Sequence, residues 1–199
     1  MELDKFDIAR NALCGAIFTY IFTPYHSAAH TLAGACIEIV NTLMSPQSKR
    51  SREKAAFECK SLSVFCKCAG KSEDEYNSFI KDIRNIYSFL KHADRDPQEK
   101  IEINPKLTEH YIFLAIRDYA VLCRGIPIEG QVYEAWYLAI NPDKIEKSQE
   151  KNSRNIATLF PNITNIDHEQ QKEMCRQLLV NTAGKPEYLM EEIKPTLGQ

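Results

Sequence analysis

Apolar residues recur at three- and four-residue spacing along most of the chain, a pattern typical of amphipathic helices. The segment from residue 4 to 22 is the clearest case, with one apolar face that returns at every turn. Residues 24–44 repeat the pattern, and Thr23-Pro24 between the two segments predicts an N-cap and a first helical residue. No segment alternates apolar and polar residues as a half-buried strand would. The pattern therefore predicts an all-α protein.

Start and stop signals predict further helices downstream. Gly70 ends a third helix at 51–69, and Ser72 with Glu75 forms a capping box that starts a fourth, which ends before Pro97. Three more helices are expected at 108–124, 129–140 and 167–181.

These helices are expected to form an up-and-down bundle of six to eight helices, because 199 residues is the size of a single domain. Residues 1–142 form its predicted core. Residues 143–199 begin with a strongly polar stretch and then regain a helical pattern. They are predicted to be a polar linker and a C-terminal helix packed on the same domain. The small residues crowded into 24–44 predict close packing against 4–22.

The composition is that of a globular protein, with 44% hydrophobic and 26% charged residues. A net charge of -2 provides no overall basic footprint for nucleic acid, although it permits a local one. The seven cysteines, mostly inside apolar helical patterns, predict reduced, core-filling thiols in a cytoplasmic protein. The apolar run from Leu13 to Phe22 is too short to span a bilayer and follows acidic residues, so no membrane contact is expected.

The end of the fourth predicted helix carries the first candidate site. Arg84, Ser88 and His92 are spaced four residues apart, so they lie along one stripe opposite the apolar face, with Asn85 beside it. A histidine can pass protons while an arginine binds a phosphate, which is sufficient for metal-free RNA cleavage. The alternative is a helix C-terminus whose cations complement the helix dipole.

The second candidate is a metal site. His26 and His30 are spaced as neighbours on one helix face, and Asp96 could join them if the second and fourth helices pack together. The alternative is that both histidines serve the core or an interface. No cofactor is expected, because the chain has no glycine-rich phosphate loop, nucleophile elbow or His-Glu-x-x-His motif.

Two carboxylates are predicted to be structural. Glu38 lies inside an apolar helix, so it is expected to pair with a cation such as Arg84 or Arg10. Glu109, beside His110 near the start of the fifth predicted helix, is interpreted as a first-turn acid that satisfies the dipole.

Residues 27–39 (SAAHTLAGACIEI) and 89–97 (FLKHADRDP) together resemble an uncharacterised family of all-helical bacterial proteins, in which the second block reads roughly NFFKHADxDP. Residues 107–110 (LTEH) are also similar. The resemblance covers about residues 5–142 and implies a helical fold, but this family has no established activity.

More distantly, the order of elements resembles HEPN domains (higher eukaryotes and prokaryotes nucleotide-binding). These are helical bundles, many of them metal-independent ribonucleases or partners of nucleotidyltransferases. Their motif is an arginine, commonly followed by a polar residue, with a histidine four to six positions later. Arg84-Asn85 matches the start, whereas His92 follows after seven intervening residues and so departs from the pattern. The resemblance implies Arg84, Asn85 and His92 as site residues.

The leading hypothesis is a HEPN-like protein that binds or cleaves RNA, as a homodimer in which two His92-bearing helices share a cleft. The rival is a non-catalytic helical protein that binds a protein partner or a ligand. The third is a small metalloprotein built on His26, His30 and His92.

Overall fold

The computed structural model describes residues 2–44, 72–92, 98, 100–123, 125–142 and 150–182. The predicted helix at 51–69 and Asp96 lie outside these ranges, as do Cys59, Cys66 and Cys68.

Every regular element in the described ranges is helical. In chain order the elements are α1 (Lys5–Phe22), α2 (His26–Met44), α5 (Glu73–Lys91), α6 (Pro105–Cys123), α7 (Ile128–Ile140), α8 (Glu150–Leu159), the 3₁₀-helix η3 (Ile163–Asn165) and α9 (His168–Thr182). The seven α-helices confirm the predicted all-α bundle of six to eight helices.

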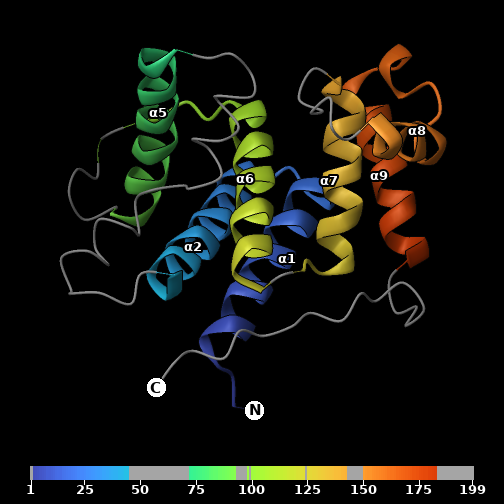
Figure 1. Ribbon diagram of the computed structural model, residues 1–199. Coiled ribbons are helices and arrows are strands. Elements are labelled where there is room, and N and C mark those ends of the chain that lie inside the picture. The colour runs from blue at the N-terminus through green and yellow to red at the C-terminus, as the bar shows by residue number, and fades with distance from the viewer. Residues whose placement is uncertain are drawn as a thin grey trace.

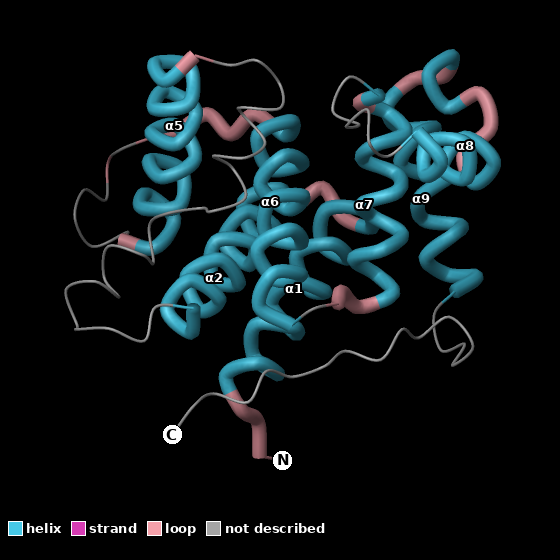
Figure 2. Tube along the Cα trace, viewed as in Figure 1, coloured by secondary structure: helices cyan, strands magenta, loops and turns pink. Residues whose placement is uncertain are grey.

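A hairpin of α1 and α2 lies at the centre of the bundle (Figure 1). Helix α6 packs on both arms of this hairpin, and α7 packs on α1 and α6. Helix α5 covers α2 at one edge of the molecule, while α8 and α9 lie on α7 at the opposite edge (Figure 1). A short described loop joins α1 to α2, and η3 lies in the connection between α8 and α9 (Figure 2). The C-terminal helix α9 therefore packs directly on helices of the predicted core.

Side chains cap the helices where the local sequence predicts it. The Glu75 amide donates to Ser72 Oγ (3.3 Å), and the Ser72 amide donates back to Glu75 Oε2 (2.9 Å). At the start of α9, the amide of Gln170 donates to Asp167 Oδ1 (2.9 Å) in the same way. Both predicted capping boxes are confirmed, because each needs only residues three apart in the chain.

The predicted N-cap at Thr23 is wrong. Thr23 is instead the C-cap of α1, and its hydroxyl donates to the Thr19 carbonyl (2.7 Å). The same hydroxyl accepts from the Tyr25 amide (3.2 Å), and α2 begins only at His26. A threonine can satisfy either helix end, so its identity alone does not fix the boundary.

Aromatic side chains from α1 and α7 fill the centre of the core. Tyr20, Tyr133 and Trp136 are fully buried, and their rings lie with centroids 5.2–6.4 Å apart. Cys36, Cys123 and Cys175 are buried, as the apolar pattern predicts. Burial raises the pKa of the Cys36 and Cys175 thiols, so both thiols stay protonated.

Gly34 on α2 allows α5 to approach closely. A Cβ atom at this position would overlap the ring of Tyr87 on α5. The small residues of α2 were expected to serve close packing against α1. Gly34 shows that α2 also uses its small residues on the side that faces α5.

Within the described residues, no helix is long and apolar enough to cross a membrane.

Candidate functional site

His30 is a structural residue of the core. Its side chain is fully buried, with Nδ1 3.2 Å from Thr108 Oγ1 and Nε2 3.4 Å from the Ile83 carbonyl. The carbonyl can only accept, so Nε2 carries the proton and Nδ1 accepts from the threonine hydroxyl. Burial lowers the pKa of His30 to about 4, which keeps the ring neutral. Both ring nitrogens are therefore occupied by the protein.

His26 lies one turn earlier and turns toward a different part of the bundle. Its ring centroid is 5.4 Å from that of Tyr20, and its Nδ1 is buried without a hydrogen-bond partner in the described structure. Burial lowers the pKa of His26, and the nearby charge of Lys172 lowers it further. No group of three or more potential metal ligands occurs among the described residues. The rings of His26 and His30 thus make different contacts, and Asp96, the third residue of the predicted metal site, lies outside the described residues.

Helix α5 packs on α2 with one face and leaves the predicted stripe outside. Ile83, Ile86 and Tyr87 are buried, whereas Arg84 and Asn85 are exposed. His92 is the partly exposed C-cap residue, and its amide donates to the Ser88 carbonyl (3.0 Å).

The packing of α5 on α2 does not bring the two histidines together. His30 contacts α5 at Ile83, nine residues before His92. At 1.5 Å per residue, that places His92 roughly 13 Å further along the helix.

Glu38 is a structural ion-pair partner, as predicted, but its cation is Lys91. Lys91 Nζ lies 2.8 Å from both carboxylate oxygens of Glu38, and the hydroxyl of Tyr87 donates to Oε2 (2.8 Å). The expected arginine partners, Arg84 and Arg10, are wrong. Arg84 lies on the exposed face of α5, whereas Lys91 reaches Glu38 from the end of the helix.

Glu109 is the main correction to the sequence analysis. The prediction of a first-turn acid is wrong, because the residue is only 3% exposed and lies one turn beyond the start of α6. Its Oε2 accepts from the Tyr20 hydroxyl (3.0 Å) and lies 2.9 Å from Nε2 of His168. Its backbone carbonyl accepts from the hydroxyl of Tyr133 (3.2 Å). Glu109 therefore joins α1, α6, α7 and α9.

Lys172 extends this group, and we refer to Tyr20, Glu109, His168 and Lys172 as the polar junction. The side chain of Lys172 is only 6% exposed, with Nζ 5.0 Å from the centre of the Tyr20 ring. Its nearest carboxylate oxygen, on the exposed Glu169, is 3.8 Å away. Burial beside Glu109 raises the pKa of Tyr20, so its hydroxyl remains a donor.

Two further contacts join α9 to the core beside the polar junction. Trp136 Nε1 donates to the Gln171 carbonyl (2.8 Å), and Arg176 donates to the Ile21 carbonyl (2.8 Å). The members of the junction thus bond mainly to one another, and their geometry is that of a docking contact for α9.

The spacing of the sequence contains one signal for Glu109. Ile112, Phe113 and Ile116 follow it at three, four and seven residues, which places the carboxylate on the buried face of α6. Its partners are 89 and 59 residues away along the chain, so they are not visible in local spacing.

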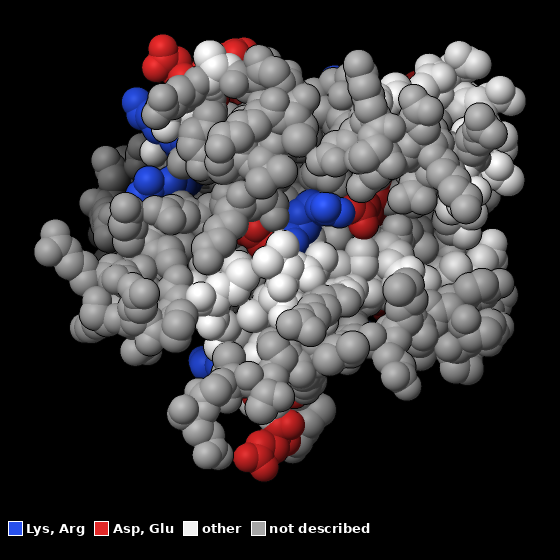
Figure 3. Space-filling model, viewed as in Figure 1, with Lys and Arg blue, Asp and Glu red and all other residues white. Residues whose placement is uncertain are grey.

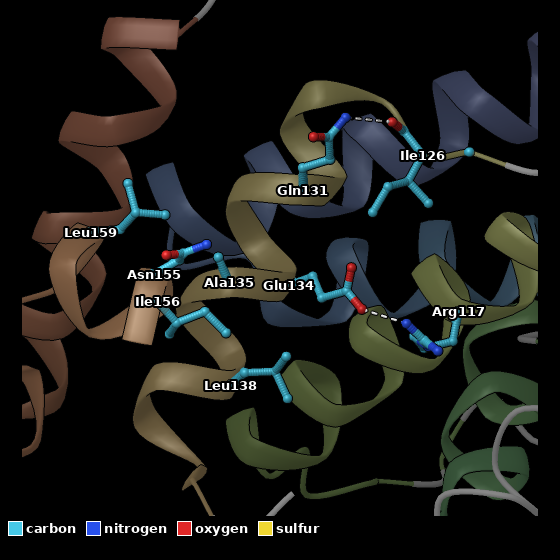
Figure 4. Close-up of a pocket in the computed structure, with 10 residues that line it drawn as sticks. Arg117, Ile126, Gln131, Glu134, Ala135, Leu138, Asn155, Ile156 and Leu159 are labelled. Atoms are coloured by element: carbon cyan, nitrogen blue, oxygen red, sulfur yellow. Dashed lines mark hydrogen bonds and ion pairs between the residues drawn. The ribbon is translucent and has the colours of Figure 1, made fainter. Parts of the chain in front are cut away.

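A cavity of about 390 Å³ lies between α6, α7 and α8. Figure 4 shows the ion pair of Arg117 and Glu134 (2.7 Å) on one side and Asn155, Ile156 and Leu159 on the other. Neither the Arg84 stripe nor the polar junction contributes to its lining.

Comparisons of the chain with models of known protein families, with curated proteins and with solved structures find no match. The class of the protein is therefore stated from its fold: the described residues form an all-α helical bundle.

Proposed function

We propose that the chain binds RNA along the outward face of α5 and cleaves it without a metal ion, with His92 as a proton-transferring group. Two helices that bear His92, one from each copy of a homodimer, would form the complete site. The outward face carries Lys81, Arg84, Asn85 and His92, and lies opposite the residues that pack on α2.

The placement of His92 is the observation that carries the proposal. Four of the five histidines are committed to the core or its helix contacts. His30 bonds Thr108, His110 bonds the Tyr137 hydroxyl (2.6 Å), His168 bonds Glu109, and His26 has its Nδ1 buried. The ring of His92 makes no hydrogen bond with the described part of the chain and is partly exposed. It thus differs from His30, His110 and His168, whose rings are already hydrogen-bonded within the bundle.

The charge of α5 supports binding from the middle of the helix onward, where Lys81 and Arg84 are exposed with one acid, Asp82, between them. Asp74 and Glu75 lie in its first turn, whereas Lys81 and Arg84 are exposed further along. Figure 3 displays Lys and Arg side chains together at the edge that α5 occupies, with acidic side chains above them. Two cations that contact phosphates of single-stranded RNA predict a log–log salt slope of about -1.4.

The distance between Arg84 and His92 explains why two copies are proposed. Eight residues of helix separate their Cα atoms by about 12 Å. The α5 helix of a single chain therefore does not place both side chains at the same phosphate. Cleavage needs a base that takes the proton of the 2′-hydroxyl and an acid that protonates the leaving 5′-oxygen. The 2′-oxygen then attacks phosphorus and the bond to the 5′-oxygen breaks, which leaves a 2′,3′-cyclic phosphate and a 5′-hydroxyl. His92 of each copy supplies one of the two groups.

The test is cleavage of a labelled single-stranded RNA by the full chain in excess chelator. We expect cyclic-phosphate products, a rate per chain that rises with protein concentration, and a loss of about 10²–10⁴-fold in His92→Gln. Arg84→Ala should weaken binding and make the salt slope shallower by about 0.7, whereas Lys106→Ala, an exposed cation at the start of α6, should leave both unchanged. Unchanged cleavage in His92→Gln, or RNA binding that Lys106→Ala weakens as much as Arg84→Ala, contradicts the proposal.

A further inference from the structure

Helix α7 has a second face at the margin of the core, where Gln131, Glu134 and Ala135 are partly buried and Leu138 still belongs to the core. Val132, Tyr133 and Trp136 point into the core. The cavity of about 390 Å³ is lined instead by Gln131 and by the residues three, four and seven positions after it, Glu134, Ala135 and Leu138. That volume is within the range of small-molecule sites. One face of α7 therefore holds the fold together while the other forms the wall of a ligand-sized space.

The apolar part of this space consists of two facing walls. Ala135 and Leu138 of α7 form one wall, and Ile156 and Leu159 of α8 form the other (Figure 4). Leu159 is 50% exposed, so apolar surface continues to the mouth of the cavity. Two apolar walls that face each other can enclose both faces of a flat ring.

Polar groups stand at the margins of these walls. The amide of Gln131 donates to the Ile126 carbonyl (3.0 Å), which holds its orientation, and its oxygen makes no hydrogen bond with the described residues. Asn155 offers a second carboxamide on α8 (Figure 4). Arg117 NH1 is bonded to Glu134 Oε1 (2.7 Å), and 46% of the Arg117 side chain is still exposed. The margin therefore presents both donors and acceptors.

The charge of the lining selects among ligand classes. Arg117 and Glu134 are the ionisable side chains of the lining, and they already neutralise each other. A phosphate or carboxylate would have to compete with Glu134 for the guanidinium. An uncharged molecule with donors and acceptors on its edge meets the carboxamides without breaking this pair. Carboxamides and arginine are also the side chains that pair with the edges of nucleobases.

We propose that this cavity binds a planar, uncharged heteroaromatic molecule, of the class of a purine base or nucleoside. The ring lies between the α7 and α8 walls, and its edge bonds Gln131 and Asn155. The site is at the edge of the bundle opposite α5 (Figure 1), so it is separate from the proposed RNA surface, and either site can fail without the other.

The experiment titrates the full chain by calorimetry with adenosine, guanosine and adenosine monophosphate. We expect saturable binding of a nucleoside at one site per chain, with the monophosphate at least several-fold weaker. Ala135→Trp fills the cavity and should reduce the affinity by at least tenfold. The matched control is Ala157→Trp, the same change at an exposed residue of α8 that does not line the cavity.

A variant on an exposed side chain avoids any dependence on core packing. Asn155→Leu should weaken nucleoside binding several-fold and leave the thermal unfolding temperature unchanged, because the Asn155 side chain is exposed and makes no hydrogen bond with the described residues. Equal affinity in Ala135→Trp and Ala157→Trp, or preferential binding of the monophosphate, overturns the proposal. The proposal is also overturned if the chain binds an aliphatic alcohol such as hexanol but binds no nucleoside.

Discussion

Helices α5 and α9 lie at opposite edges of the molecule, and each is attached to the central helices through a histidine, in two different ways. At α5 the histidine belongs to the centre: His30 is fully buried, neutral, and bonded to a carbonyl and a hydroxyl. At α9 it belongs to the peripheral helix: His168 is 38% exposed and bonded to the buried carboxylate of Glu109. Histidine thus attaches a peripheral helix in two ways, as a neutral ring bonded to uncharged groups or as the partner of a buried carboxylate. Which of the two occurs depends on the acceptor that lies beside the ring.

The two contacts should also respond differently to perturbation. The α5 contact combines close packing at Gly34 with a histidine that must remain neutral. The α9 contact combines several polar bonds around one carboxylate. Substitutions and pH can therefore weaken one contact and leave the other intact.

Removal of Glu109 should have the largest effect. In Glu109→Ala the side chains of Tyr20 and His168 lose their shared acceptor inside the bundle, which costs about 3–5 kcal/mol in the free energy of unfolding. Glu169→Gln is the control, because this carboxylate is 78% exposed and should cost less than about 1 kcal/mol. Urea unfolding measures both variants, and equal losses would show that the junction does not hold α9.

Acidification should act on the α5 contact through His30. The folded pKa, about 4, is below the unfolded value of 6.5, so the unfolded chain binds the proton first as pH falls. The free energy of unfolding is therefore highest above pH 6.5. It falls by about 3 kcal/mol in total as the pH falls from 6.5 toward 4. His26, whose pKa is also lowered, adds to the same trend.

The test is to measure the free energy of unfolding between pH 6.5 and 4 in the wild type and in His30→Gln, and to compare the two slopes against pH. The variant should be less stable at pH 7 and show a shallower slope. An unchanged slope would mean that His30 is not the group that titrates.

Gly34→Ala should test the close packing of α5. The new Cβ would overlap Tyr87, and relief of the overlap should cost about 1–3 kcal/mol. Gly15→Ala is the matched control within α1, because its Cβ would meet Leu32 at an ordinary 3.4 Å. That variant should be neutral or more stable by up to about 1 kcal/mol. A double-mutant cycle with Tyr87→Ala should recover part of the Gly34→Ala loss, and strict additivity would contradict the overlap.

Lys91→Gln should have the smallest effect. The ion pair with Glu38 is partly exposed, and Tyr87 continues to donate to the same carboxylate, so the loss should be below about 1 kcal/mol. Thermal unfolding in low and high salt measures it. A larger loss than that of Gly34→Ala would mean that charge, and not packing, attaches α5.

Local sequence alone determined most of the helices and, where a capping box is present, their starts. The apolar spacing predicted α1, α2 and α6, and the capping boxes at Ser72 and Asp167 were read from residues only three apart. These features depend on periodicity and on neighbouring residues. The orientation of Arg84 and Asn85 away from the packed face of α5 followed from the same periodicity.

Only the tertiary structure decided which distant residues meet. Glu109 contacts Tyr20 and His168, which are 89 and 59 residues away along the chain. Gly34 on α2 packs against Tyr87 on α5. His30 was a metal candidate by spacing and is a neutral core residue by packing. The cavity between α7 and α8 has no counterpart in local spacing. Helix periodicity sets the face on which a side chain lies, whereas the neighbour on that face depends on how the helices pack.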